Sequence, residues 1–115
     1  MHILVVDDDE QCARLLERAL RRLGHDPVVA LHPTDALDLF HAQSFDAIIT
    51  DIDMPEMSGI ELARQIRAES DGPIAFCTGS APGGQEKGGA LEYGAVFPKL
   101  SRDGDVARMV DRLKR

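Results

Sequence analysis

Five short apolar runs, separated by longer amphipathic segments, limit the fold of this chain more than any other feature of its sequence. Each run is too short for a helix and is bounded by acids, glycine or proline, which indicates a strand. The first, third and fourth runs are apolar throughout, as in strands that are buried on both faces of a sheet. The predicted strands are Ile3–Val6, Val28–Leu31, Ala47–Thr50, Ile74–Cys77 and Val96–Phe97.

The segments between these runs have helical spacing. In the first of them, apolar residues at i, i+3, i+4 and i+7 predict a helix that ends at Gly24. Its apolar face carries Leu16, Ala19, Leu20 and Leu23. Ser58 is expected to cap another helix, with Glu61 completing a capping box. The remaining predicted helices cover residues 34–42, 85–93 and about 106–113.

Alternating strands and helices predict an α/β fold, in which a doubly wound parallel sheet carries helices on both faces. A chain of 115 residues has the size of one domain. The sequence contains no internal repeat, linker or change of composition. We therefore expect residues 1–115 to form a single domain.

Charge and composition argue against several classes of function. A net charge of -7 argues against direct binding to nucleic acid or to an anionic membrane, because both need a surplus of Lys and Arg. No apolar stretch approaches the ~20 residues that span a bilayer, and the N-terminus does not resemble a signal peptide. Cys12 and Cys77 have no metal-ligand spacing, and we expect two buried, reduced thiols in a cytoplasmic protein.

Polar residues come directly after the predicted strands. They are Asp7, Asp8 and Asp9 after the first strand, Asp51 after the third, Thr78 after the fourth and Lys99 after the fifth. Open parallel sheets bind ligands beyond the carboxyl ends of their strands, so these groups are expected to converge on one rim. Oxygen ligands select a hard cation, and a few carboxylates with room for water suit Mg²⁺. A cation, an ammonium and a hydroxyl would hold a phosphoryl group, and a carboxylate there could attack it.

Each of these residues also has a purely structural interpretation. An acidic turn after a strand is often a helix cap, a role open to Asp9 or Glu10. Thr78 could simply end a strand, Lys99 could be a surface lysine, and Asp51 could lie in an ordinary loop. The combination favours the functional interpretation, because separate strand ends supply complementary chemistry.

Over its whole length the sequence resembles the response-regulator receiver family. The segment Ile3–Asp9 is similar to the opening strand and acidic pair of that family. The segment Thr50–Gly59, in which an Asp is followed by Met-Pro and then by Gly, is similar to its phosphoacceptor loop. Thr78, the turn before Ala95, and Lys99 match further family positions.

This resemblance implies the family fold, with strand order 2-1-3-4-5, and a magnesium-dependent phosphoacceptor. Asp51 would be the nucleophile, and its donor would be a phosphohistidine on a histidine kinase or histidine phosphotransfer protein. Phosphorylation would then switch the conformation of the domain. No enzyme activity is expected beyond self-catalysed phosphotransfer and autodephosphorylation.

The resemblance also implies roles for the residues around Asp51. Asp7, Asp8 and Asp51 would bind Mg²⁺ together with the backbone carbonyl of Asp53. Thr78 would hydrogen-bond the phosphoryl oxygens. Lys99 would pair with Asp51 before transfer and with the phosphoryl group afterwards.

The sequence departs from the family pattern near its fifth strand. Leu100 follows Lys99, where the family usually has Pro. The stretch from Gly94 to Lys99 is two residues shorter than typical, so the switch aromatic of the family maps to Val96, with Phe97 beside it. The segment before the fourth predicted helix is rich in glycine. These departures lie on the face by which the family usually signals.

A stripe of arginines on the first predicted helix has two interpretations. Arg14, Arg18 and Arg21 lie at i, i+4 and i+7. They could form a solvated face with ion pairs to Glu10 or Glu17. Alternatively, the histidine-bearing helices of the phosphodonor could dock on them.

Two other functions remain open. A phosphatase of the haloacid dehalogenase type also forms an aspartyl phosphate on Mg²⁺, and Asp7 and Asp9 could mimic its Asp-x-Asp motif. The modified residue, Asp7 or Asp51, would distinguish the two. A receiver that is never phosphorylated could serve only as a protein-interaction module, with no need for Mg²⁺. No output domain is expected here, so the chain is either a stand-alone receiver or part of a longer regulator, with an unidentified downstream target.

Overall fold

The structure of the chain is a computed structural model, and it describes residues 1–78, 93–98 and 103–114. In chain order the elements are β1 (His2–Val6), α1 (Glu10–Arg22), β2 (Asp26–Ala30), α2 (Pro33–Ala42), β3 (Ala47–Asp51), α3 (Gly59–Arg67), β4 (Ile74–Thr78), β5 (Ala95–Pro98) and α5 (Asp103–Leu113). The predicted helix over 85–93 lies outside the described residues, except for Tyr93, which lies in a turn.

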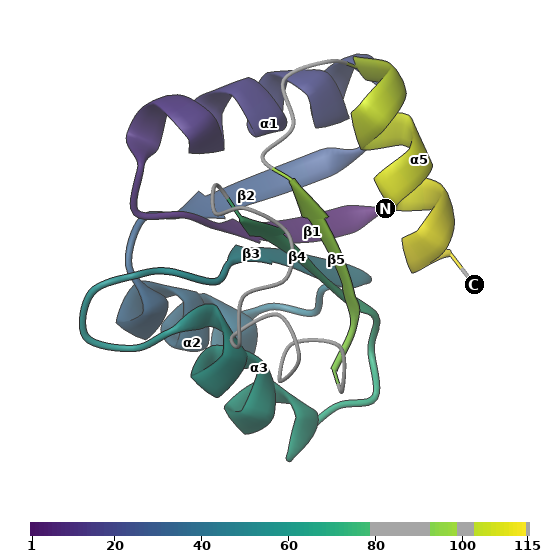
Figure 1. The fold of residues 1–115 in the computed structure, drawn as a ribbon. Helices are drawn as coiled ribbons and strands as arrows, with labels where there is room; N and C mark the ends of the chain where they lie inside the picture. Colours follow the sequence, from purple (N-terminus) through teal and green to yellow (C-terminus); the bar gives the residue numbers. More distant parts are fainter. Residues whose placement is uncertain (79–92, 99–102, 115) are drawn as a thin grey trace.

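The described strands form one parallel sheet of five strands in the order β2-β1-β3-β4-β5 (Figure 1). This order confirms the predicted fold class. The chain winds outward from β1 to β2 and then returns to place β3 on the other side of β1. The carboxyl ends of β1 and β3 therefore flank the switch point, which is where open α/β sheets bind their ligands.

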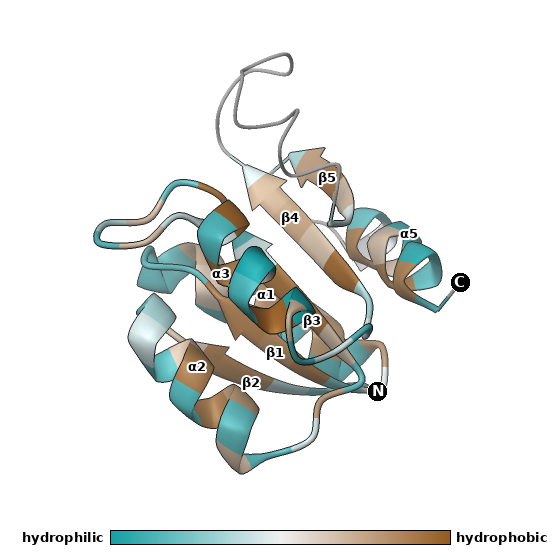
Figure 2. Cartoon of the chain, turned by 90° about the horizontal axis from the view of Figure 1, so that it is seen from below, coloured by the Kyte–Doolittle hydropathy of each residue, from teal (hydrophilic) through white to brown (hydrophobic). Residues whose placement is uncertain are grey.

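Helices cover both faces of the sheet because the strands are apolar on both sides. Ile3 and Val5 of β1 pack in the core that contains residues of α1 and α5. Leu4 and Val6 pack in the opposite core, with residues of α2 and α3. Successive side chains of a strand point to opposite faces, so an uninterrupted apolar run serves both cores. Figure 2 shows the hydrophobic strands between helices that turn hydrophilic faces outward.

The predicted helix boundaries follow from local capping. Gly24 has a φ of 88°, a left-handed conformation, and it follows the last residues of α1 as predicted. The Ser58 hydroxyl accepts a hydrogen bond from the backbone N–H of Glu61 at 3.2 Å, which confirms the predicted cap of α3. The carboxylate of Glu61 pairs with Arg64. Only the serine half of the predicted capping box is therefore confirmed.

Two predictions need correction. The second strand was expected over Val28–Leu31, but β2 covers Asp26–Ala30. The sheet extends to Asp26 because this edge strand tolerates Pro27, whose missing N–H is not needed on an edge. Cys77 is buried as expected, whereas Cys12 is only half-buried on α1, and the two cysteines form no disulfide. None of the described helices is long and apolar enough to cross a membrane.

Candidate functional site

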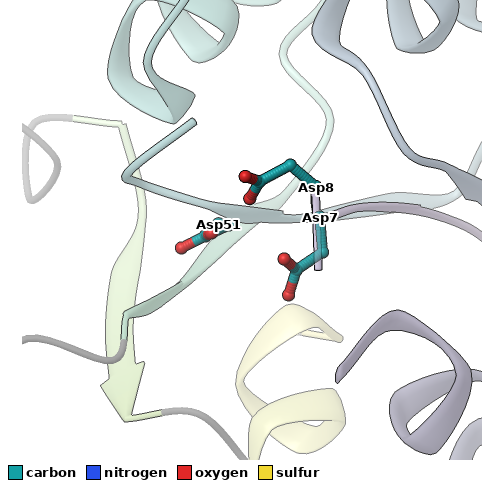
Figure 3. A group of neighbouring side chains, drawn as sticks. All are labelled: Asp7, Asp8 and Asp51. Atoms are coloured by element: carbon teal, nitrogen blue, oxygen red, sulfur yellow. The ribbon is translucent and has the colours of Figure 1, made fainter. Parts of the chain in front are cut away.

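Three carboxylates gather at the carboxyl ends of the two central strands (Figure 3). Asp7 and Asp8 follow β1, and Asp51 is the last residue of β3. One oxygen from each carboxylate lies within 4.8 Å of the other two. Asp7 and Asp51 each expose only 6% of their surface, whereas Asp8 is exposed. These three residues, the acidic cluster, are therefore partly shielded and open to solvent on the Asp8 side.

Asp9 has a different role from the two acids before it. Its carboxylate accepts hydrogen bonds from the backbone N–H groups of Gln11 and Cys12, at 3.0 and 3.3 Å. It is thus the N-cap of α1, one of the structural roles that the sequence left open. The backbone N–H of Asp9 donates to the Asp7 carboxylate at 2.9 Å. The cap of α1 and the acidic cluster are therefore joined through Asp7.

Contacts from both directions fix the backbone of Asp51. The buried Thr50 hydroxyl donates to the carbonyl oxygen of Asp51 at 3.0 Å. Gly59, the first residue of α3, lies so close that a Cβ there would be 1.8 Å from the same oxygen. Sequence reasoning did not assign Thr50 a role, although a hydroxyl within an otherwise apolar run was a usable signal. The absence of a side chain at Gly59 is what allows α3 to begin beside Asp51.

The loop between β3 and α3 includes a strained turn. Glu56 has a φ of 71°, in the left-handed region that residues with a side chain rarely adopt. The backbone N–H of Met57 donates to the carbonyl of Pro55 at 2.8 Å, which closes the turn around Glu56. Met54 and Met57 pack against the core on the α2 and α3 side. The two methionines therefore anchor the loop, and the left-handed conformation of Glu56 makes the tight bend between them.

The remaining predicted site residues differ in burial, and one of them lies outside the described residues. Thr78 is the last residue of β4 and is nearly buried, with 9% of its surface exposed. It follows Cys77, which lies opposite Asp51 in the ladder between β3 and β4. Asp53 is exposed in the loop after β3. Lys99 lies outside the described residues.

The chemistry of the acidic cluster suits a hard divalent cation. Carboxylates at this separation repel one another, and a cation between them relieves that repulsion. The grouped ligand atoms are all carboxylate oxygens, which favour Mg²⁺ over zinc. Exposure of Asp8 leaves room for water in the coordination shell, which Mg²⁺ retains more readily than other biological cations.

The two residues that the sequence singled out on β5 face opposite cores. Val96 packs on the α2 and α3 side of the sheet, and Phe97 packs on the α1 and α5 side. The position to which the family's switch aromatic maps is therefore occupied by valine. Phe97 packs on the opposite face, because successive side chains of a strand point to opposite faces.

The ion pairs considered for the arginine stripe are present. Arg14 lies 3.5 Å from Glu10 and 3.2 Å from Glu17, and Arg21 lies 3.3 Å from Glu17. The Arg18 guanidinium reaches the backbone carbonyl of Arg14 at 3.5 Å. Surface pairs of this kind add little stability, so they leave the stripe available for a binding role.

Comparison with known proteins places these observations in a family. The sequence matches the family described as Response regulator receiver domain over residues 3–113. A chemotaxis protein CheY homolog of Campylobacter jejuni (strain 81-176) is 43% identical over 83 residues. That match covers 68% of this chain and 64% of the relative, less than two thirds of its length.

Two solved structures share the whole architecture. The chemotaxis protein CheY4 of Vibrio cholerae superposes with a TM-score of 0.86 at 25% identity, covering 97% of each chain. The response regulator TrrA of Thermotoga maritima, solved in complex with Mg²⁺ and BeF, has a TM-score of 0.83 at 29% identity, again over 97% of each chain.

Proposed function

Because the chain belongs to the response regulator receiver family, we propose that it takes a phosphoryl group onto Asp51 and signals through the change of conformation that follows. Receiver domains are signalling modules of two-component systems that interact with histidine kinases and phosphotransfer proteins. The observation that carries the proposal is the acidic cluster, in which a carboxylate oxygen of Asp51 lies within 4.8 Å of one from Asp7 and one from Asp8.

The residues of the acidic cluster fit Mg²⁺, and TrrA, a structural relative, was solved with Mg²⁺ and BeF. Asp7, Asp8 and Asp51 would hold the ion, with the backbone carbonyl of Asp53 as a further ligand. Bound there, Mg²⁺ would offset the negative charge of the phosphoryl oxygens. In keeping with the family pattern, the exposed carboxylate of Asp8 would bind it directly.

In the transfer, the carboxylate of Asp51 would be the nucleophile. A carboxylate oxygen of Asp51 would attack the phosphorus of a phosphohistidine on the donor protein. The new O–P bond forms as the N–P bond breaks, and the histidine nitrogen keeps the electron pair and takes up a proton. Later attack by water on the same phosphorus would release inorganic phosphate and regenerate the carboxylate. Burial of Asp51 limits the access of that water.

Two further residues would stabilise the transferred group. The Thr78 hydroxyl, one residue beyond the ladder partner of Asp51, would donate a hydrogen bond to a phosphoryl oxygen. The Lys99 ammonium would pair with Asp51 before transfer and with the phosphoryl group afterwards. Cys12 and Cys77 would stay reduced if the protein acts in the cytoplasm, as we propose.

The capping role of Asp9 argues against the rival phosphatase. The haloacid dehalogenase mechanism needs both acids of an Asp-x-Asp motif at the reacting centre. Here the Asp9 carboxylate is engaged with the backbone of α1, and the acidic cluster takes Asp8 and Asp51 as partners of Asp7. This geometry favours Asp51 as the acceptor.

Intact mass spectrometry after incubation with Mg²⁺ and acetyl phosphate tests the proposal, with Asp51→Asn and Asp7→Asn as variants. We expect one Mg²⁺-dependent phosphoryl adduct that disappears in Asp51→Asn and maps to Asp51 by peptide sequencing. An adduct on Asp7 would establish the phosphatase instead. Absence of both an adduct and Mg²⁺ binding in the wild type would establish the interaction-only module.

A further inference from the structure

We propose that a second copy of this chain docks on the face formed by α1, the edge strand β2 and α2, through an exposed leucine and an adjoining hollow of opposite charge. This surface is distinct from the acidic cluster, and its use does not depend on phosphorylation of Asp51.

Leu15 is the exposed apolar side chain of this face. It exposes 42% of its surface and is the one exposed large apolar side chain in the part of the chain that the structure describes. It lies on the outer side of α1 in a shallow depression whose lining includes Arg14 and Arg18. An exposed leucine between two arginines is suited to an apolar pocket with acidic walls.

A hollow of that kind lies on the same face of the chain. It has a volume of about 570 Å³ and lies between α1 and α2, over the end of β2. Val29, Leu31 and Leu39 give it an apolar lining, and Asp35 and Asp38 line its α2 side. Both carboxylates are exposed and lie three residues apart on one face of α2, as close neighbours on a helix surface do.

The charges of the two features are complementary. Arg14, Arg18 and Glu10 line the depression around the leucine, and Asp35, Asp38 and Arg14 line the hollow. Arg14 is already paired with glutamates of α1, so Arg18 supplies most of the uncompensated positive charge. Pairing of these groups between two copies would fix their relative orientation and oppose the repulsion expected from a net charge of -7.

The leucine and the hollow adjoin, because Arg14 lines both depressions. A surface that carries an exposed leucine beside a hollow can pair with itself about a two-fold axis, so that the leucine of each copy enters the hollow of the other. Pairing through the β2 backbone is disfavoured, since Pro27 removes a donor from this edge. Side chains of α1 and α2 would therefore carry the contact.

Sedimentation equilibrium of the full chain over a wide concentration range tests this proposal. We expect the mass to rise from that of a monomer toward that of a dimer. Reversing the charges of the hollow with Asp35→Lys and Asp38→Lys should raise the dimer dissociation constant at least about tenfold. Arg14→Glu with Arg18→Glu reverses the positive charges beside Leu15 and should raise the dimer dissociation constant by a similar factor.

An equimolar mixture of these two double variants provides the decisive measurement, because it restores opposite charges across the interface. We expect the mixture to form a heterodimer at concentrations at which each double variant alone stays monomeric. The matched control for the Asp35 and Asp38 reversal is Asp71→Lys with Asp111→Lys, which changes the net charge by the same amount and sign away from this face. It should leave the dissociation constant of the otherwise unchanged chain within about twofold.

Leu15→Gln removes the exposed apolar side chain without altering charge, and it should also raise the dimer dissociation constant about tenfold. A wild-type chain that stays monomeric throughout would refute the proposal. A dimer insensitive to both charge reversals and to Leu15→Gln, or a mixture of the two double variants that stays monomeric, would refute it equally.

Discussion

Gly59 and Asp51 are in contact at the start of α3, where a Cβ atom on residue 59 would lie 1.8 Å from the carbonyl oxygen of Asp51. The backbone N–H of Gly59 also donates to the carbonyl of Ile52 at 2.8 Å. The first residue of α3 is therefore packed directly against the residue proposed to carry the phosphoryl group. The position of Asp51 depends on the missing side chain of its neighbour.

Gly59→Ala is expected to lower the free energy of unfolding by about 1–3 kcal/mol, because the added methyl group must displace backbone. It should also slow phosphoryl uptake from acetyl phosphate, since Asp51 moves with its carbonyl group. Urea denaturation and intact mass measure the two effects. Gly104→Ala is the matched control, because a Cβ at Gly104 meets nothing within 4 Å and should leave both properties largely unchanged.

Asp8→Asn is expected to weaken Mg²⁺ binding about tenfold or more, because it removes a charged ligand from the acidic cluster. Asp9→Asn should leave the affinity almost unchanged, since asparagine caps a helix as well as aspartate does. Isothermal titration calorimetry measures both. Equal losses of affinity in the two variants would contradict the separation of Asp9 from the metal site.

Glu56→Gly is expected to raise the free energy of unfolding by about 0.5–1 kcal/mol. Glycine adopts a positive φ without strain, although it also gains freedom in the unfolded chain. Glu56→Ala removes the same charge but keeps the strain, so it should bring no such gain in urea denaturation. A similar rise in both variants would assign the effect to the charge and not to the backbone.

The imidazole of His2 should titrate above its ordinary pKa. A hydrogen bond to Gln43 and then the pairing with Asp26 raise this pKa, with ring nitrogens 3.0 and 2.9 Å from the two side-chain oxygens. The raised pKa stabilises the folded protein. This stabilisation is complete below pH 6.5, the pKa of the imidazole in the unfolded chain, and is lost as the pH rises through the raised pKa of the folded state. In His2→Gln this loss of stability with rising pH should disappear from the pH profile of unfolding.

His25 provides a comparison of opposite sign within the same chain. Burial lowers the pKa of its imidazole. The contribution of His25 to the stability of the fold is therefore present above pH 6.5 and is lost as the pH falls through the lowered pKa. NMR titration of the two imidazoles should therefore give pKa values on opposite sides of 6.5. Two coincident values would show that at least one of the two environments does not act as described.

The sequence alone was sufficient for the alternation of strands and helices. A continuous apolar run as short as Ala47–Thr50 is a local pattern that is typical of a strand buried on both faces. The caps at Asp9 and Ser58 are local as well, because the oxygen and the N–H that it accepts are two or three residues apart. The expectation that Asp7, Asp8 and Asp51 converge needed only the rule that parallel strands end on one rim.

Tertiary structure decided what each of these residues does at the rim. Asp8 and Asp9 are neighbours of the same type, yet one joins the acidic cluster and the other caps α1, since the path of the chain after β1 turns their side chains apart. The contact of Gly59 with Asp51 and the opposite faces taken by Val96 and Phe97 depend on how separate segments pack. Local sequence specifies backbone conformation, whereas distances between remote side chains are set only when the sheet and its helices close around the two cores.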